Sequence, residues 1–301
     1  LLDRPKNITP IEPPQPRPPI EARPEKLSVT EIEKWMRDPY TIYAKHILRL
    51  KPLKPLYEIP TFADFGNIVH VVFDEFLRQF PLYNQTLDKS FYINFLTECG
   101  KKHIDNIGYF PEISVFWESR IVQIYNWFVD KELSTQDPIK DRKTEVLGET
   151  SFLVGNTNFT LTAVADRIDI MKNGNLLIID YKTGTIPSSK EVEAGFSPQL
   201  PLEAVIASTG GFSNIPQSKS IQLEYWRVRG GNNPGEVVRP SENIGKLQQD
   251  ALEGVKHLVE VYQDKETPYP SRPNPSYAPQ YSDYEHLARV KEWSTFTKRS
   301  R

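Results

Sequence analysis

Two aspartates and a lysine stand close together in the segment ADRIDIMKNGNLLIIDYKTG, residues 165–184. Asp166 lies fourteen residues before Asp180, and Lys182 follows two residues later. Carboxylate oxygens suit Mg²⁺, which is usually held by one or two carboxylates together with phosphate oxygens of a substrate. A bound cation can acidify water, and a lysine beside it can stabilise charge in the transition state. These residue types predict metal-assisted cleavage of a phosphodiester.

The turn between the two aspartates decides whether they can share a site. Asn173-Gly174 is a strong hairpin signal. A two-residue loop would set Asp166 opposite Tyr181 and turn Asp180 to the other face, because side chains alternate along a strand. A three-residue loop, Lys172–Gly174 with Gly174 left-handed, sets Asp166 opposite Asp180. A metal site therefore predicts the longer loop or a bulge. The alternative is an ordinary surface hairpin with solvated Asp and Lys side chains.

The segment resembles the PD-(D/E)xK nuclease signature, in the D-Y-K-T-G form shared by RecB-type nuclease domains. Upstream, Gly66-Asn67-Ile68-Val69-His70 resembles the family's glycine–apolar–histidine helix. The resemblance implies that His70 ligates the metal with Asp166 and Asp180, and that the main-chain carbonyl of Tyr181 is a further ligand. The alternative for His70 is packing in an apolar helix. The remaining histidines match nothing and are expected to be ordinary: His46, His103, His257 and His286.

Residues 199–203, QLPLE, resemble the family's Q-L-x-x-Y segment on the helix that follows the lysine strand. The resemblance implies that Gln199 orients the active site or the DNA backbone through its amide. Glu203 stands where a tyrosine is usual, which puts contact of a phenol with DNA in doubt but leaves the metal site intact. Glu149, in the first expected strand, is either a water-mediated contributor to the metal site or an ordinary strand-edge carboxylate.

The flanking segments resemble the C-terminal nuclease domains of AddB-type helicase–nuclease subunits, in particular the alphaproteobacterial type. The resemblance implies a Mg²⁺-dependent DNA nuclease, with Mn²⁺ able to substitute. It implies exonucleolytic processing of double-strand-break ends in recombinational repair, with DNA and an AddA-like helicase/nuclease subunit as partners. Two alternatives remain: a non-catalytic DNA-binding or scaffold module of the same fold, and a stand-alone or CRISPR-associated nuclease of the superfamily. The sequence has no Walker A motif, so ATP hydrolysis must come from elsewhere.

Many relatives hold an iron–sulfur cluster with four cysteines. The corresponding positions here carry no sulfur: Asp38, Pro279, Ser282 and Ala288. Since such a cluster needs four thiolates, we expect no iron–sulfur cluster. Aromatic packing is expected to join the two ends instead, through Trp35, Tyr277, Tyr281 and Tyr284.

The pattern along the chain predicts an α/β fold: a restriction-endonuclease-like mixed sheet flanked by helices, with a helical N-terminal addition. Residues 1–26 are proline-rich and read as a linker, and residues 27–301 as the nuclease domain. Within that domain, 27–140 is expected to be mainly helical, 141–240 to form the catalytic sheet core, and 241–301 to form a helix and a Pro/Tyr-rich docking tail. Strands are expected at 145–154, 159–171, 175–182 and 220–229, and helices at 191–208, 244–263 and 285–293.

The resemblance implies a bacterial cytoplasmic, nucleoid-associated protein, and the composition is that of a soluble globular protein. The 301 residues are 38% hydrophobic and 25% charged, as in soluble globular proteins. No apolar run reaches the roughly 18 residues of a membrane span, so no membrane partner is expected. The single cysteine excludes an internal disulfide. A net charge of −2 argues against a protein that coats DNA nonspecifically, and it suggests that a partner supplies part of the DNA affinity.

Overall fold

The computed structural model describes residues 11–53, 59–82, 88–106, 110–135, 138–279 and 281–297. The chain forms two compact units. The terminal unit comprises Leu1–Lys54, Ser151–Thr160 and Gly254–Arg301, and the central unit comprises Pro55–Thr150 and Leu161–Glu253. No helix among the described residues is both long and apolar enough to cross a membrane.

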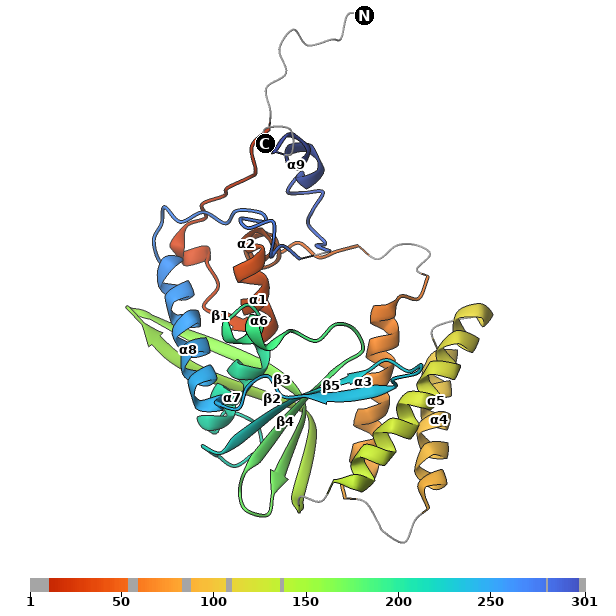
Figure 1. Cartoon of the computed structure of the whole chain (residues 1–301). Helices are drawn as coiled ribbons and strands as arrows, with labels where there is room; N and C mark the ends of the chain where they lie inside the picture. Colours follow the sequence, from red (N-terminus) through yellow and green to blue (C-terminus); the bar gives the residue numbers. More distant parts are fainter. Residues whose placement is uncertain are drawn as a thin grey trace, which may run out of the picture. The chain divides into compact units, whose positions relative to one another are not determined.

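The chain is mainly helical up to Ser134, and most of its strands follow from Ile139 on (Figure 1). The helices are η1 (Ile20–Ala22), α1 (Val29–Arg37), α2 (Pro39–Ile42), the π-helical turn η2 (Tyr43–Ile47), α3 (Phe62–Gln79), α4 (Lys89–Asp105), α5 (Pro111–Ser134), α6 (Ser189–Glu193), α7 (Gln199–Ser208), α8 (Ile244–Val261) and α9 (Val290–Thr297). The strands are β1 (Lys26–Ser28), β2 (Ile139–Val154), β3 (Thr157–Met171), β4 (Leu176–Lys182), β5 (Ile221–Val228) and β6 (Gly235–Val238).

Six strands form one mixed sheet, in the order β1-β3-β4-β5-β6, with β2 also paired to β3. Strand β4 is antiparallel to β3 and parallel to β5, and β5 is antiparallel to β6. The parallel pair needs a crossover connection, and α6 and α7 provide it. The expected α/β fold with a mixed sheet flanked by helices is confirmed.

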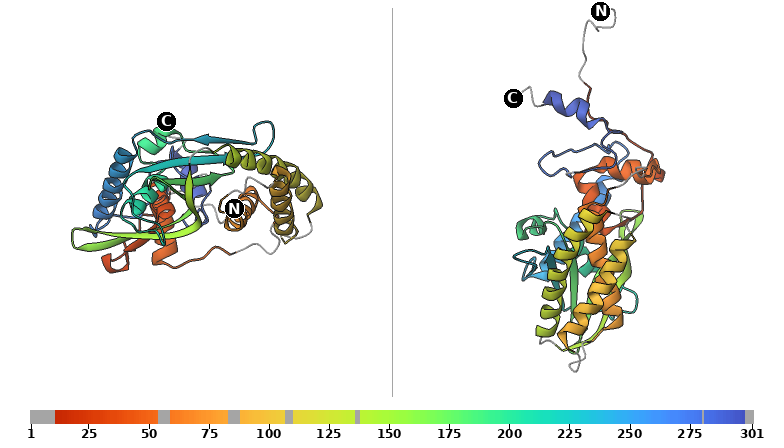
Figure 2. Two further views of the ribbon diagram at one scale, coloured as in Figure 1. Left: turned by 90° about the horizontal axis from the view of Figure 1, so that it is seen from below. Right: turned by 90° about the vertical axis from the view of Figure 1, so that its right-hand side faces the viewer.

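The two faces of β4 have different neighbours within the central unit. Tyr181 and Ile179 face a core that contains the apolar sides of α3, α4 and α5. The ring of Tyr181 packs edge-on against Phe73 at 4.9 Å and Phe128 at 6.4 Å. Figures 1 and 2 show these three helices side by side. Because side chains alternate along a strand, Asp180 and Lys182 face the other way, toward α7.

Several element boundaries differ from those expected. Strand β2 begins at Ile139 rather than near residue 145. The crossover helix expected over 191–208 is two helices, because Gly195 takes a left-handed φ of 79° that ends the first one. The terminal helix expected over 285–293 begins only at Val290, after Arg289 with a φ of 53°.

In the terminal unit, α1 begins as its sequence predicts. The Ser28 side chain accepts from the Glu31 N–H, and the Glu31 carboxylate accepts from the Ser28 N–H, which forms a capping box. Trp35 is buried against Tyr262, with ring centroids 4.7 Å apart, and stacks on Tyr269. Arg23, within the proline-rich segment, is also buried and donates to the carbonyls of four C-terminal residues: Tyr262, Asp264, Lys265 and Thr267.

The C-terminal tail docks through Tyr284, as expected, and through further residues that were not expected. The Tyr284 hydroxyl donates to the Leu50 carbonyl at 2.8 Å, and Ser282 donates to Asp38 at 3.3 Å. A small buried cluster joins α2 and η2 to the tail: Tyr40, Ala44, Tyr284, Ala288, Val290 and Trp293. Tyr277 and Tyr281 are exposed, 38% and 83%, so their predicted role in this packing was wrong. Residues 273–277 form a continuous exposed run, and the next buried positions among the described residues are Tyr284, Ala288 and Val290.

Candidate active site

The hairpin between β3 and β4 has the register that a shared site requires. Arg167 pairs with Ile179, and Ile170 pairs with Leu176. Continuing this register by one step places Asp166 opposite Asp180. The loop is Lys172–Gly174, with a φ of 85° at Gly174. The predicted three-residue loop is therefore confirmed, and it brings the two carboxylates to the same face of the sheet.

Asp180 is the centre of a hydrogen-bonded network. Its Oδ1 accepts from Lys182 Nζ at 2.9 Å and from Gln199 Nε2 at 2.7 Å. The Gln199 Oε1 in turn accepts from Lys182 Nζ at 3.3 Å. Burial raises the pKa of Asp180 to about 6, in spite of the lysine charge that lowers it and with a further rise from Asp166. Burial alone would lower the pKa of Lys182, but Asp180 raises it, so the lysine stays a cation.

Asp166 joins this network to α3. Its Oδ2 accepts from the Tyr181 backbone N–H at 2.8 Å, and its Oδ1 lies 3.3 Å from Nδ1 of His70. The His70 ring also packs edge-on on the ring of Tyr181, 5.9 Å away. Burial alone would lower the pKa of His70, but its contact with Asp166 and the charge of Asp180 raise it. The structure thus gathers His70, Asp166, Asp180, Lys182 and Gln199 in one place.

Glu145 belongs to the site, although its sequence context did not single it out. One ligand atom each of Glu145, His70 and Asp166 lies within 4.8 Å of the others. Within β2, Glu145 has a φ of 47°, a left-handed conformation that is rare for a residue with a side chain. Burial and the charge of Asp166 raise the pKa of its carboxyl. Glu149, the other glutamate considered on this strand, donates its backbone N–H to the Gly211 carbonyl.

Glu203 lies one helical turn beyond Gln199, with its side chain buried under Asp180. Gln199 Nε2 donates to its Oε1 at 3.2 Å. Burial, followed by the charges of Asp180 and Asp166, raises the pKa of Glu203 well above the ordinary range. This burial favours the protonated form of the Glu203 carboxyl.

The opposite face of β3 carries a buried ion network. Asp169 Oδ1 accepts from Arg142 Nε at 2.8 Å, and its Oδ2 accepts from Arg167 Nη2 at 2.6 Å. Glu132 of α5 pairs with both arginines, at 2.9 Å from Arg142 Nη2. All four side chains are at most 2% exposed. This network fixes β2, β3 and α5 directly behind the face that bears Asp166.

Two hollows open beside these residues. One, of about 480 Å³, is lined by His70, Asp74, Glu145, Asp166 and three further residues: Asn67, Val71 and Val164. The other, of about 680 Å³, lies just past Lys182. Its lining combines backbone and small polar groups with two arginines and exposed aromatic surface: Phe62, Ala63, Phe65, Arg120, Thr183, Gly184, Thr185, Arg229 and Gly230.

The donor set suits a hard divalent cation. Among the described side chains, Asp180 Oδ2 and Glu203 Oε2 are buried oxygens without a hydrogen bond, although the former lies 2.7 Å from Lys182 Nζ. Buried carboxylate oxygens normally have partners. Oxygens from Asp166, Asp180 and Glu145, with the His70 imidazole, are ligands that Mg²⁺ or Mn²⁺ accepts. The residues therefore fit such an ion.

Comparison with known proteins agrees with this geometry. The family model described as the PD-(D/E)XK nuclease superfamily matches residues 26–280. An uncharacterised protein of Rickettsia conorii is 34% identical over 255 residues, which cover 81% of this chain and 29% of that protein. One of Rickettsia bellii is 32% identical over 279 residues, covering 88% and 32%. The chain thus spans less than a third of the length of these relatives. The match to a crystal structure of SSO0001 covers 77% of this chain and 75% of the SSO0001 chain, with 12% identity. Its TM-score of 0.30 is too low to inform the fold.

Proposed function

The chain belongs to the PD-(D/E)XK nuclease superfamily, and we propose that it is a Mg²⁺-dependent deoxyribonuclease that hydrolyses phosphodiester bonds. The observation that carries the proposal is the convergence of Asp166, Asp180 and Lys182, joined by His70. A merely DNA-binding copy of the fold would have no need for an ammonium group held against a buried carboxylate. We propose residues 27–301 as the nuclease domain, behind a linker of residues 1–26.

Each residue of the network has a distinct role in this proposal. Asp166, Asp180, Glu145 and His70 would hold the cation, and the Tyr181 carbonyl is a proposed further ligand. A divalent cation, when bound, acidifies a water molecule and neutralises charge on the phosphate. Lys182 presents its ammonium where negative charge builds up on the phosphate oxygens. Gln199 fixes the orientation of Asp180, and the Tyr181 ring, packed on Phe73, holds the strand end in place.

The hollow past Lys182 is the proposed path of a DNA strand. Arg120 and Arg229 supply positive charge, and Arg229 Nη2 donates to the Gly184 carbonyl at 3.3 Å. Phe62 is 71% exposed and offers a ring on which a base can stack. Because Thr183 of this lining directly follows Lys182, a strand lying here would bring its backbone to the carboxylates. Arg229→Ala should weaken DNA binding and flatten its salt dependence.

The decisive experiment measures degradation of end-labelled linear DNA in Mg²⁺. Asp180→Ala and Lys182→Ala should each lower the rate by on the order of 10²–10³-fold or more, because both act on charge that develops during the reaction. Lys172→Ala removes a lysine from the exposed loop of the same hairpin and should leave the rate unchanged. Chelation of the metal should stop cleavage by the wild type. Equal cleavage by wild type and Asp180→Ala would refute the proposal.

A finer proposal concerns the biological setting. The resemblance of the flanking segments to AddB-type subunits supports exonucleolytic processing of double-strand breaks beside an AddA-like helicase–nuclease subunit. Circular and linear substrates of the same sequence separate the modes of cleavage, since an exonuclease leaves a covalently closed circle intact. Co-purification of the full-length protein with an AddA-like subunit tests the partnership. A stand-alone exonuclease would degrade linear DNA at full rate without any partner.

A further inference from the structure

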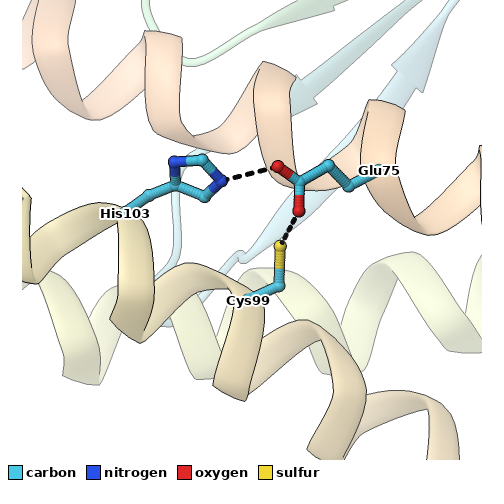
Figure 3. A group of neighbouring side chains, drawn as sticks. All are labelled: Glu75, Cys99 and His103. Carbon is cyan, nitrogen blue, oxygen red and sulfur yellow. Dashed lines mark hydrogen bonds and ion pairs between the residues drawn. The ribbon is translucent and has the colours of Figure 1, made fainter.

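A second group of metal-binding side chains lies in the central unit, apart from the residues of the proposed nuclease site. Figure 3 shows Cys99 and His103 pointing from α4 toward Glu75 of α3. Cys99 Sγ donates to Glu75 Oε2 at 2.8 Å, and His103 Nε2 lies 2.8 Å from Glu75 Oε1. One ligand atom from each side chain falls within 4.8 Å of the other two.

The sequence spacing produces this arrangement. Cys99 and His103 are four residues apart on one helix, so both side chains lie on the same face, one turn apart. Neighbouring helices α3 and α4 place Glu75 opposite them. Taken one at a time, His103 and the lone cysteine carry no signal, because the glutamate that completes the group lies more than twenty residues upstream.

We propose that Glu75, Cys99 and His103 bind a Zn²⁺ ion that joins α3 to α4. Zinc takes thiolate, imidazole and carboxylate ligands at about 2.0–2.3 Å in a tetrahedron. Ligand atoms of such a tetrahedron lie about 3.5 Å apart, which is within the spread of these three atoms. Mg²⁺ is excluded from this site because it avoids soft thiolate ligands. Solvent has access to the fourth position, since the side chains of Glu75 and His103 are 42% and 25% exposed.

A buried hydroxyl lies next to this group. Tyr125 is fully buried, and among the described residues its hydroxyl oxygen has no hydrogen-bond partner. A side chain at Gly100, the residue after Cys99, would collide with this hydroxyl, so the hydroxyl lies against α4 next to the proposed ligand. A thiolate held there by Zn²⁺ would place negative charge near this unpaired donor, which a neutral thiol does not.

Binding of the metal must displace a proton. Burial and the Glu75 hydrogen bond raise the pKa of the Cys99 thiol to about 12, so without metal it is a neutral thiol that donates to Glu75. Zn²⁺ replaces that proton, the Zn–S bond forms, and one proton leaves to solvent. The same pKa argues against Cys99 as a nucleophile or redox sensor, because these roles need a thiolate.

Cobalt provides the test, because a thiolate bound to Co²⁺ absorbs in the near ultraviolet and Cys99 is the chain's only cysteine. The purified chain, stripped of metal, is titrated with Co²⁺ alone. We expect a thiolate-to-cobalt band that saturates at one equivalent and that Zn²⁺ abolishes. Cys99→Ser should remove the band, and His103→Gln should weaken Co²⁺ binding by at least about tenfold. His257→Gln, a matched change at an exposed position on α8, should leave the titration unchanged.

Two further measurements separate this site from the nuclease site and from loss of fold. Asp180→Ala should keep the full cobalt band, because Asp180 belongs to the other group. Zn²⁺ should raise the melting temperature of the wild type and of His257→Gln, but not of His103→Gln. The proposal is overturned if folded wild-type protein gives no thiolate–cobalt band. It is equally overturned if His103→Gln and Glu75→Gln both bind Co²⁺ as tightly as the wild type, since cysteine alone would then be the ligand.

Discussion

The side-chain amide of Gln199 holds both halves of the Asp180–Lys182 ion pair. Its Nε2 donates to Asp180 Oδ1 at 2.7 Å, while its Oε1 accepts from Lys182 Nζ at 3.3 Å. Helix α7, which follows the lysine strand, thus orients the two groups proposed to act on the metal and on the phosphate. The amide carries a donor for the carboxylate and an acceptor for the ammonium at the same time.

Gln199→Ala should therefore raise the Mg²⁺ concentration needed for half-maximal cleavage. Loss of a group that orients a metal ligand commonly costs about 10–100-fold in metal affinity or activity. Gln199→Glu should be at least as damaging, since it brings a further carboxylate against Asp180. Gln249→Ala, at an exposed position on α8, is the matched control. Unchanged Mg²⁺ dependence in Gln199→Ala would rule out this orienting role.

Glu145 and Glu149 offer a matched pair on one strand. Glu145 lies with His70 and Asp166, and we expect Glu145→Gln to weaken Mg²⁺ activation because it removes a charge from the ligand group. Glu149→Gln should leave activation nearly unchanged. Mg²⁺ titrations of both variants on the same DNA decide between them. The reverse result would make Glu149 the contributor from β2.

The sequence predicted the hairpin and its site because their geometry is local. The alternation of side chains along β3 and β4 leaves two registers open, and the requirement that the aspartates share a site selects the three-residue loop that places Asp166 opposite Asp180. Gln199 and His70 were identified as site residues by their resemblance to family motifs rather than by their spacing. The sequence analysis did not identify Glu145 as a site residue. The position of its side chain depends on a backbone φ of 47° inside a strand, and the residues KTEVLGET give no signal of that conformation.

Contacts between residues far apart in the sequence were also not predicted. The alternation in Asp166-Arg167-Ile168-Asp169 implies that Arg167 and Asp169 lie on the face of β3 opposite to Asp166. It does not predict that Glu132 and Arg142 pair with them there. Likewise, of the three tail tyrosines that the sequence assigned to docking, only Tyr284 is buried. Tyr284 is buried and Tyr281 is exposed because of the way the tail turns before α9, a tertiary outcome.

Removing one member of the buried ion network should strongly destabilise the central unit. Arg142→Met leaves Glu132 and Asp169 with one arginine between them, and breaking a buried pair in this way costs about 3–5 kcal/mol of unfolding free energy. Lys143→Met breaks a half-exposed pair with Asp141 and should cost less than about 1 kcal/mol. Denaturant unfolding measures both.

A double variant tests whether that loss is due to unpaired charge. Arg142→Met combined with Asp169→Leu removes opposite charges together, so its cost should fall below the sum of the two single costs. Additive costs would show that the arginine contributes by packing alone.

Glu31 should make the stability of the terminal unit depend on pH. Burial alone would raise the pKa of its carboxyl, but hydrogen bonds from His46, Lys45 and the Ser28 N–H hold that pKa well below its ordinary value of 4.5. A lowered folded-state pKa means stability that is fully present above the unfolded value of 4.5 and is lost as the pH falls below it. Glu31→Gln should therefore be less stable than the wild type at about pH 6, and the difference should shrink toward about pH 3.

Denaturant unfolding followed by tryptophan fluorescence measures this difference in unfolding free energy. Glu33→Gln on the same helix is the control, for which the difference should be smaller. A gap between wild type and Glu31→Gln that stays constant over this range would contradict the linkage.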